Sequence, residues 1–445
     1  MTNSLKLLPV AALLLGLSGC GLFGGGGDEE TTPTIGNRVA VLPAESGIEA
    51  DPAIADVAIT LPAAARNSDW TQPGGDADKT MGHLELSAQP ARAWSVQIGE
   101  GSSKRGYLGA APVVEGNRVF VMDARSVVSA YDTQTGRQLW QASLVREGEG
   151  ERSAAGGGVS VFGGRVYATS GYGLVAAYDA TTGNQFWQAD AEVPLRGAPT
   201  VAEGRVIVMT QDNQAFAYSE QTGERDWEIV GTVEPTGLLG ASAPAVALDT
   251  VVVGFSSGEL QAVRIENARI VWQDTIARTG RTSSLTALSD IDASPVIDPA
   301  QSRVYAMGHG GRIVSLDFTT GQRVWEQSVG GTSLPWLAGN WLFAVSTNAE
   351  LVALQAIDGR VRWISQLQHY RKPEKKKDLI TYRGPVLAGG RLWLTSSQGQ
   401  LLAVDPATGE VVWSAEAAKQ FYQPPVVAGG TLYLLDESGR LSAWR

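Results

Sequence analysis

Residues 178–187 read YDATTGNQFW, and close copies of this stretch recur along almost the whole chain. The pattern predicts a β-hairpin. A strand ends at Asp179, whose carboxylate can accept a backbone N–H two residues further on, and Gly183 supplies the positive φ that the return strand requires. Trp187 then lies on the return strand. The copies lie at residues 131–140, 218–227, 263–272, 316–325, 354–363 and 404–413.

The spacing of these copies predicts a repeat architecture whose units bury their faces against each other. Trp94, in a stretch similar to the one around Trp325, begins a series that ends at Trp413. The series covers seven steps over 319 residues, about 46 residues per step, which is the length of a four-stranded propeller blade. Leucine-rich and ankyrin repeats are too short for this spacing.

Two sets of eight features define the number of blades. The tryptophans on predicted outer strands are Trp94, Trp140, Trp187, Trp227, Trp272, Trp325, Trp363 and Trp413, and we expect them to pack one blade against the next. Small-residue stretches that lead into inner strands centre on Pro112, Gly158, Pro199, Pro244, Pro295, Pro335, Pro385 and Pro425.

The two chain ends are predicted to complete one blade together. Trp94 has no strands before it, and the last unit, residues 423–445, stops after three strands. A shared blade would close the ring and leave no large unpaired sheet edge. The expected fold is therefore all-β: an eight-bladed β-propeller of four-stranded antiparallel blades, closed by an N-terminal strand that completes the C-terminal blade.

The N-terminal residues have the pattern of a bacterial lipoprotein signal peptide, residues 1–19. Lys6 is followed by an apolar stretch too short to span a bilayer, and this runs into the lipobox LSGC at residues 17–20. Cys20 is the only cysteine, and we expect it to be lipidated and to anchor the protein through its acyl chains. An ordinary secretory signal with a chance cysteine is the alternative.

Two further regions follow the signal. Residues 20–66 are rich in Gly, Ala, Pro and Thr without sustained periodicity, which predicts a lipidated cysteine on a flexible tether with a reach on the order of 35 to 40 Å. Residues 67–445 are predicted to form the propeller. The tether would let the propeller stand off the membrane.

The charge of the chain bears on two kinds of partner, nucleic acid and acidic surfaces. The formal net charge of −11 argues against nucleic acid. One basic run, RKPEKKK at residues 371–377, lies between blades. It is either a solvated loop or a contact for an acidic partner or for phospholipid headgroups.

The repeated small-residue stretch, D-x-x-T-G turn and tryptophan resemble the eight-bladed propeller of quinoprotein (PQQ-type) dehydrogenases. Within that fold, the lipobox, the Gly-rich tether, DWTQPGG at residues 69–75 and two loop motifs resemble the BamB family, lipoproteins of the outer-membrane β-barrel assembly (BAM) complex. The resemblance implies a periplasm-facing, lipid-anchored scaffold of the outer membrane that is not an enzyme and needs no cofactor. Such a scaffold would aid the folding and insertion of outer-membrane proteins.

The two loop motifs are VPLRG at residues 193–197 and LSDID at residues 288–292. Both connect an outer strand to the next inner strand, and all such connections lie on one face of a propeller. The resemblance implies that this face docks on a periplasmic POTRA domain of BamA. The partner-binding residues carried over from the family are Val193, Leu195, Arg196, Asp290 and Asp292. Many relatives have leucine at the position of Val193, so this apolar contact would be smaller here.

The residues themselves are compatible with docking, because an exposed Leu195 beside Arg196 and a carboxylate pair has the composition of a binding hot spot. Two structural alternatives stay open. Arg196 could pair with Asp290 or Asp292 inside the protein, and Asp292 could cap the strand that follows it. No metal is expected at the carboxylate pair, because no neighbouring glutamate offers bidentate coordination.

A different class of function, a periplasmic PQQ-dependent dehydrogenase-like protein, is the main alternative, and an envelope- or carbohydrate-binding propeller is another. The chain has three histidines, His83, His309 and His369, and no nucleophile, base and orienting group stand together in the sequence. Unfolded outer-membrane proteins are possible further partners, and their pairing with blade edges is an open possibility.

Overall fold

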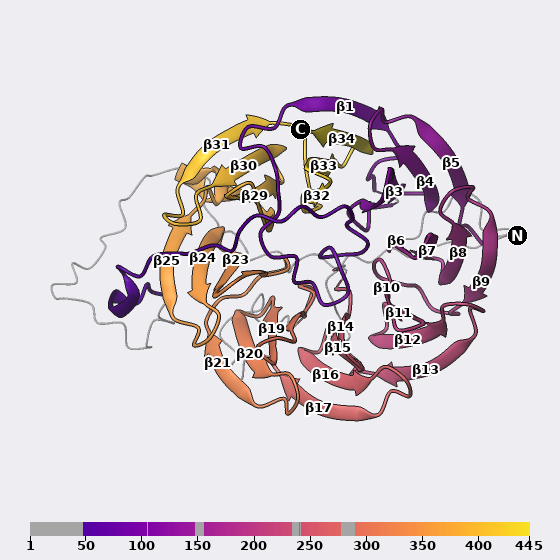
Figure 1. Cartoon of the computed structure of the whole chain (residues 1–445), viewed down its shortest axis with the longest axis horizontal. Coiled ribbons are helices and arrows are strands. Elements are labelled where there is room, and N and C mark those ends of the chain that lie inside the picture. The colour runs from indigo at the N-terminus through magenta and orange to yellow at the C-terminus, as the bar shows by residue number, and fades with distance from the viewer. Residues whose placement is uncertain (1–47, 105, 147–154, 234–239, 241, 277–289) are drawn as a thin grey trace, which may run out of the picture. The chain divides into compact units, whose positions relative to one another are not determined.

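The computed structural model describes residues 48–104, 106–146, 155–233, 240, 242–276 and 290–445, which lie in one compact unit. They form eight four-stranded antiparallel sheets arranged in a ring (Figure 1). The prediction of an all-β, eight-bladed propeller is confirmed. Helical structure in the described residues is limited to two short 3-10 turns, η1 (Pro52–Ile54) and η2 (Pro373–Lys375).

Each blade runs from an inner strand near the axis to an outer strand at the rim. Blade 1 contains β2 (Val113–Glu115), β3 (Arg118–Met122), β4 (Val127–Asp132) and β5 (Gln138–Ser143). Blade 2 contains β6 (Gly157–Phe162), β7 (Arg165–Ser170), β8 (Leu174–Asp179) and β9 (Gln185–Asp190). Blade 3 contains β10 (Thr200–Ala202), β11 (Arg205–Met209), β12 (Gln214–Ser219) and β13 (Arg225–Val230). Blade 4 contains β14 (Ala245–Ala247), β15 (Thr250–Gly254), β16 (Glu259–Arg264) and β17 (Ile270–Thr275).

The second half of the ring repeats this order. Blade 5 contains β18 (Val296–Asp298), β19 (Arg303–Gly308), β20 (Arg312–Asp317) and β21 (Arg323–Gln327). Blade 6 contains β22 (Trp336–Ala338), β23 (Trp341–Val345), β24 (Glu350–Gln355) and β25 (Val361–Gln366). A small hairpin, β26 (Tyr370–Lys372) and β27 (Lys377–Leu379), precedes blade 7, which contains β28 (Tyr382–Ala388), β29 (Arg391–Ser396), β30 (Gln400–Val404) and β31 (Val411–Glu416). Blade 8 contains β32 (Val426–Ala428), β33 (Thr431–Leu435), β34 (Arg440–Trp444) and β1 (Arg92–Gln97).

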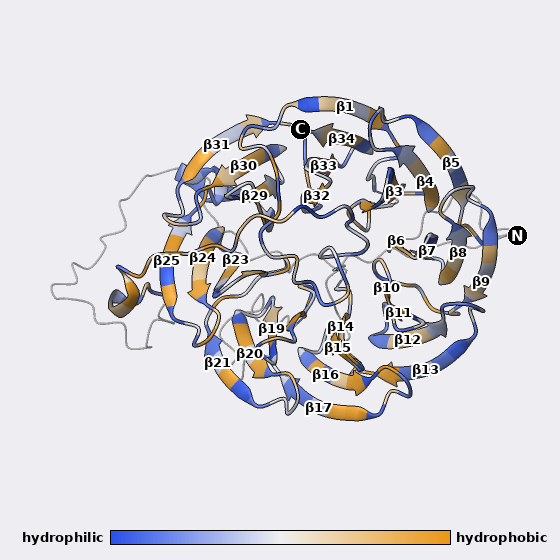
Figure 2. Ribbon diagram, in the orientation of Figure 1, coloured by the Kyte–Doolittle hydropathy of each residue, from blue (hydrophilic) through white to orange (hydrophobic). Residues whose placement is uncertain are grey.

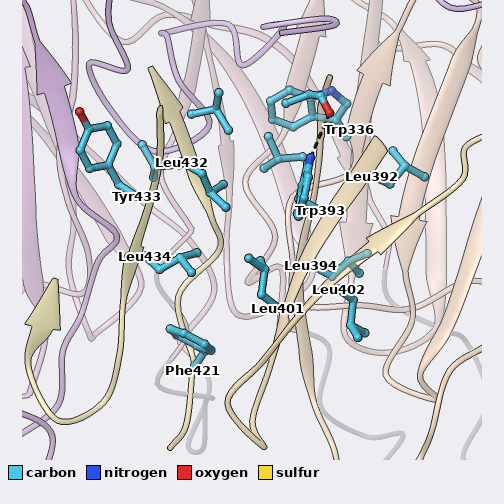
Figure 3. Packing of buried hydrophobic residues seen from close by; sticks show 14 of the residues in the cluster. Trp336, Leu392, Trp393, Leu394, Leu401, Leu402, Phe421, Leu432, Tyr433 and Leu434 are labelled. Carbon is cyan, nitrogen blue, oxygen red and sulfur yellow. Dashed lines mark hydrogen bonds between the residues drawn. The ribbon is translucent and has the colours of Figure 1, made fainter. Parts of the chain in front are cut away.

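Burial differs between the middle and the outer strands because blades pack face to face. Middle strands such as β20 and β24 are buried on both faces, whereas outer strands such as β5 and β31 alternate between exposed and partly buried residues. Figure 2 shows the same contrast, with hydrophobic colour concentrated in β20 and β24 and a largely hydrophilic β13. Figure 3 shows Trp336, Trp393 and neighbouring leucines of blades 6 to 8 packed together in the largest core cluster. The core is thus a series of interfaces between blades.

The repeated tryptophan hydrogen-bonds to the hairpin of the following blade and packs against it. The indole Nε1 of Trp140 donates a hydrogen bond of 3.0 Å to the carbonyl oxygen of Ala180 in the next D-x-x-T-G turn. Gly183 of that turn has φ +75°, and a Cβ there would lie 2.7 Å from the Trp140 ring. The glycine therefore provides both the turn geometry and the space for the indole. The indole and this turn thereby pack one blade against the next.

The same indole hydrogen bond recurs around the ring. Its donors are Trp94, Trp140, Trp187, Trp227, Trp272, Trp325 and Trp363. Trp413 faces blade 8, whose third and fourth strands come from opposite chain ends and share no hairpin. Its ring lies edge-on to that of Trp393 in the same blade, with the ring centroids 5.7 Å apart.

Ring closure follows the prediction from the chain ends. Strand β1 pairs antiparallel with β34, with Trp94 opposite Ala443 and Gln97 opposite Arg440. The backbone N–H of Ala91 donates to the carbonyl oxygen of Arg445 at 2.7 Å. Blade 8 therefore combines the strand that precedes blade 1 with the three C-terminal strands, which closes the ring.

Residues 67–84, here called the belt, contact all eight blades in ring order. Starting at blade 8 and continuing through blades 1 to 7, the hydrogen-bond partners of the belt are Gly429, Val114, Val161, Val201, Val246, Ile297, Trp336 and Leu387. Most of these partners belong to inner strands, so the belt lies over the middle of the ring, as the indigo trace in Figure 1 shows. Trp70 is buried and stacks on Trp336 with ring centroids 5.9 Å apart.

The chain joins the propeller earlier than the predicted boundary at residue 67. The backbone N–H of Asp51 donates to the carbonyl oxygen of Val361 at 2.8 Å, and Ile54 is buried. The tether prediction is therefore too long at its C-terminal end, because a Pro- and Ala-rich segment without periodicity gives no sign that it hydrogen-bonds to a blade more than 300 residues away in the sequence.

Candidate functional site

A cavity of about 870 Å³ lies along the axis of the ring. Trp70, Pro73 and Gly74 of the belt line it, as do Arg196 and Asp292 of inter-blade connections and Arg383 at the start of β28. The belt bonds to the turns that follow the inner strands of blades 1, 7 and 8, at Gly116, Gly389 and Gly429, whereas the connections lead into the N-terminal ends of inner strands. The belt and the connections therefore bound opposite ends of the cavity, and the two predicted loop motifs belong to the connection end.

The loop at residues 193–197 is held between blades 2 and 3 by backbone hydrogen bonds. The N–H of Arg196 donates to the carbonyl oxygen of Met209 at 2.9 Å, and the N–H of Gly157 donates to the carbonyl oxygen of Arg196 at 2.7 Å. Leu195 forms a β-bridge with Thr210 and has 0% of its surface exposed. The expectation that Leu195 is an exposed anchor is wrong.

The burial of Leu195 has a packing cause, because the bridge to Thr210 turns its side chain into the interface of blades 2 and 3. There it contacts a cluster that includes Tyr167, Trp187 and Val208. Val193 is half-buried beside the same cluster, and Pro194 is exposed. The accessible part of the loop is therefore Val193, Pro194 and the half-buried Arg196.

The side chain of Arg196 extends past blade 3 to blade 4. Its Nη2 donates a hydrogen bond to Oγ of Ser256, which follows β15 of blade 4. Ser256 is itself positioned by its backbone N–H, which donates to Oδ1 of Asn213 at 2.8 Å. The guanidinium is thus held by residues of blades 3 and 4 rather than left free on its own loop.

The second motif, of which residues 288 and 289 lie outside the described residues, lies between blades 4 and 5. The backbone N–H of His309 donates to the carbonyl oxygen of Asp290 at 2.8 Å, and the N–H of Ile291 donates to the carbonyl oxygen of Phe255 at 3.2 Å. Asp290 and Asp292 are 1% and 7% exposed. Both carboxylates are therefore buried, and Asp292 lines the cavity.

The electrostatic environment of Asp292 favours its neutral form. Burial raises the pKa of this carboxyl to about 7, the neighbouring Asp290 adds to the rise, and the positive charges of Arg196 and Arg383 partly oppose it. Burial also lowers the pKa of the Arg383 guanidinium. The charges of both arginines thus act on Asp292, which agrees with the topological expectation that the two motifs share one end of the propeller.

Arg383 was not among the predicted site residues. It is the second residue of β28 in blade 7, and its Nη1 donates to Oγ1 of Thr332 at 2.5 Å while its Nε donates to the carbonyl oxygen of Tyr422 at 3.2 Å. Its electrostatic interaction with Asp292 depends on ring closure, because 91 residues separate the two positions. No local motif in the sequence marks it.

Within the described ranges, no group of three or more His, Cys, Asp or Glu side chains could hold a metal ion. The described residues form no helix that is long and apolar enough to cross a bilayer. Cys20 lies outside the described residues, so its predicted lipidation stays a prediction.

Comparison with known proteins gives a family match over most of the chain. The sequence model of the family described as "Outer membrane protein assembly factor BamB" matches residues 81–151, 124–365 and 371–444. A protein of that name from Escherichia coli (strain K12) is 30% identical over 370 residues, covering 74% of this chain and 82% of its own. The Yersinia pestis protein of that name is 28% identical over 335 residues, with the same shares covered.

Solved structures confirm the fold. BamB from Moraxella catarrhalis matches with a TM-score of 0.66 and 18% identity, covering 80% of this chain and 100% of that chain. The quinohemoprotein alcohol dehydrogenase from Comamonas testosteroni matches with a TM-score of 0.67 and 15% identity, covering 86% and 81%. At these identities the likeness concerns the propeller alone, which hosts more than one function.

Proposed function

Because the chain belongs to the family of outer membrane protein assembly factor BamB, we propose that it acts as a non-enzymatic scaffold of the outer-membrane β-barrel assembly complex. The observation that carries this proposal is the family match, which extends over all eight blades and includes both loop motifs. In this role the protein aids the folding and insertion of outer-membrane proteins. It faces the periplasm and is held at the outer membrane by a lipidated Cys20.

The connection end of the cavity is the proposed docking surface for a POTRA domain of BamA. Loops can vary there without disturbing the strand ladders, and Arg196 combines a charge with partial exposure next to Val193. Arginine is favoured at binding hot spots, because its planar guanidinium forms directed hydrogen bonds. We assign the direct contact to Val193 and Arg196.

Leu195, Asp290 and Asp292 are buried and support this surface from inside the protein. Leu195 fixes the loop between blades 2 and 3, and the two carboxylates lie in the connection between blades 4 and 5. The positive charge of Arg196 in turn acts on Asp292. These three residues therefore shape the surface, and their substitution alters binding through stability or through the position of Arg196.

The test compares two neighbouring substitutions that separate contact from support. Arg196→Glu should weaken capture of BamA by at least tenfold, about 1.4 kcal/mol, and should lower the melting temperature only modestly, through loss of the hydrogen bond to Ser256. Leu195→Ala should lower the free energy of unfolding by about 2–5 kcal/mol, since it removes a fully buried side chain. Arg137→Glu, on an exposed turn at the opposite end of the blades, is the control that makes the same charge change.

Three outcomes are decisive. If the Arg196→Glu variant captures BamA as well as the unchanged protein does, the connection end is not the docking surface. Equal weakening by Arg137→Glu would mean that only net charge matters. A large loss of stability in Arg196→Glu, with capture retained by the folded fraction, would assign the arginine an internal structural role.

A further inference from the structure

The hairpin β26–β27, residues 370–379 and here called the basic hairpin, projects from a rigid root between blades 6 and 7. Its strands pair Tyr370 with Leu379 and Lys372 with Lys377. At the root, the N–H of Ile380 donates to the carbonyl oxygen of His369 at 2.9 Å, and Ile380 is 2% exposed. The base is therefore fixed to the propeller, while residues 371–379 are all exposed.

The exposed arm is strongly cationic. It contains one arginine and four lysines against two acidic residues, in a chain whose formal net charge is −11. Lys372 Nζ lies 2.9 Å from Asp378 Oδ2, and both side chains stay more than half exposed. Leu379, at the end of the arm, is 63% exposed. The arm thus combines a positive field with an apolar side chain that faces water.

The composition of the arm favours a lipid surface over a folded protein partner. Interfaces between proteins are depleted in lysine and enriched in arginine and aromatic residues. Clusters of lysine beside a membrane bind anionic headgroups as flexible point charges and need no preformed pocket. Four of the five cations in the arm are lysines, and none of these four is buried.

A second observation places the incoming chain on the same blade. The segment before the belt is bound to β25, the outer strand of blade 6: Asp51 N–H donates to the carbonyl oxygen of Val361, and Arg362 Nε donates to the carbonyl oxygen of Val57, both at 2.8 Å. Both contacts are at the start of β25, and the basic hairpin begins four residues after its end, so the incoming chain and the arm lie at opposite ends of the same outer strand. Residues 20–47, which the sequence predicts to carry the lipid anchor, therefore connect to the blade that bears the cationic arm.

We propose that the basic hairpin binds an anionic lipid surface and holds the blade 6 side of the propeller against the membrane to which the chain is tethered. The orientation of the propeller rests on the lipid anchor of the proposed function. Binding of the basic hairpin to lipid does not depend on that anchor. The connections with Val193 and Arg196 lie between blades 2 and 3. The membrane contact and the BamA contact therefore use different blades and can form together.

Vesicle binding tests the proposal with the mature chain carrying Cys20→Ala, so that no acyl chain contributes. The protein is titrated with vesicles of phosphatidylglycerol and phosphatidylcholine in equal parts and with vesicles of phosphatidylcholine alone. We expect binding only to the anionic vesicles, with a steep loss as salt is raised, because headgroup attraction is screened beyond a Debye length.

Two double variants with the same change in net charge isolate the arm. Lys375→Glu with Lys377→Glu reverses two cations of the basic hairpin and leaves the Lys372–Asp378 pair intact. Arg137→Glu with Arg269→Glu reverses two exposed cations on the turns before β5 and β17. The first should weaken binding to anionic vesicles by at least tenfold, since each cation near such a surface is worth about fivefold. The second should stay within about twofold of the unchanged protein.

The possible contrary results are distinct. Equal loss in both double variants would show that only overall charge matters, and equal binding to both vesicle types would show that headgroup charge does not; either result overturns the proposal. If the basic-hairpin variant keeps vesicle binding and loses capture of BamA, the hairpin contacts protein and the lipid assignment is wrong. Arg196→Glu should leave vesicle binding unchanged. An error in the proposed BamA docking surface would therefore appear only in the capture of BamA and not in vesicle binding.

Discussion

At the scale of single residues, the recurring glycine has two functions that the structure allows to be separated. Gly183 and Gly204 have nearly equal φ values of +75° and +74°, but only Gly183 packs against a tryptophan ring; a Cβ at Gly204 would meet nothing within 4 Å. The conformational requirement is thus the same at both positions. Only at Gly183 does the absence of a side chain also allow the next blade to approach.

We expect Gly183→Ala to cost more stability than Gly204→Ala. The positive φ alone should cost about 1 kcal/mol in each variant. At Gly183 the new methyl group would also displace Trp140, and overpacking of this kind typically costs about 1–3 kcal/mol more. Urea unfolding of both variants gives the difference directly. Equal losses would mean that the indole moves aside without cost and that the contact is not part of blade packing.

The buried Asp292 carboxyl predicts a pH dependence of stability. Its pKa is raised from 3.8 to about 7 in the folded protein, so between these values the folded state binds more protons than the unfolded state. Stability should therefore fall as pH rises through this window, by up to about 1.4 kcal/mol per pH unit from this group. Asp292→Asn should remove that contribution. Chemical unfolding at pH 4 to 8 checks the slope, and an identical slope in the variant would refute the assignment.

At the scale of elements, the belt shows what the sequence could and could not predict. The hairpins were predictable because an Asp, a Thr and a Gly within five residues specify a local turn, and strand alternation marks the flanking strands. The belt has no such periodicity. Its Gln72 bonds to Val201 and its Gly82 to Trp336, and partners this far apart in the sequence leave no local pattern.

The belt should contribute to stability through Trp70. This side chain is 3% exposed and stacks on Trp336, so Trp70→Ala should lower the free energy of unfolding by about 3–5 kcal/mol. Ser68→Ala, two residues earlier and exposed, should change it by less than about 0.5 kcal/mol. Thermal and urea unfolding of the pair measure the effect. A small loss for Trp70→Ala would show that the belt lies on the propeller without supporting it.

The candidate site illustrates a different limit of sequence reasoning. The prediction that both loop motifs lie at one end of the ring followed from topology, and Arg196 and Asp292 do line the same cavity. The exposure of Leu195 could not be predicted, because a single β-bridge to Thr210 decides which way its side chain points. Arg383 is brought into electrostatic contact with Asp292 only by the closed ring. Side-chain direction in connections is a property of tertiary structure.

At the scale of the whole molecule, closure depends on a single six-residue strand from the opposite end of the chain. Strand β1 covers the edge of β34 and places Trp94 against the hairpin of blade 1, where its Nε1 donates to the carbonyl oxygen of Thr133 at 2.9 Å. Without β1, blade 8 would have three strands, and the backbone groups along one side of β34 would lose their partners. An unpaired edge of this kind recruits strands from other molecules.

Two variants separate the packing of Trp94 from the closing of the edge. Trp94→Ala should destabilise the protein by about 3–5 kcal/mol and leave it monomeric, because the backbone of β1 still covers β34. Deletion of residues 91–99 should lower the melting temperature further, by on the order of 5–10 °C, and should also cause concentration-dependent association through the exposed strand. Thermal unfolding and sedimentation velocity at several protein concentrations distinguish the two. If the deletion variant stays monomeric and has the same melting temperature as the Trp94→Ala protein, the ring is stable without the fourth strand of blade 8.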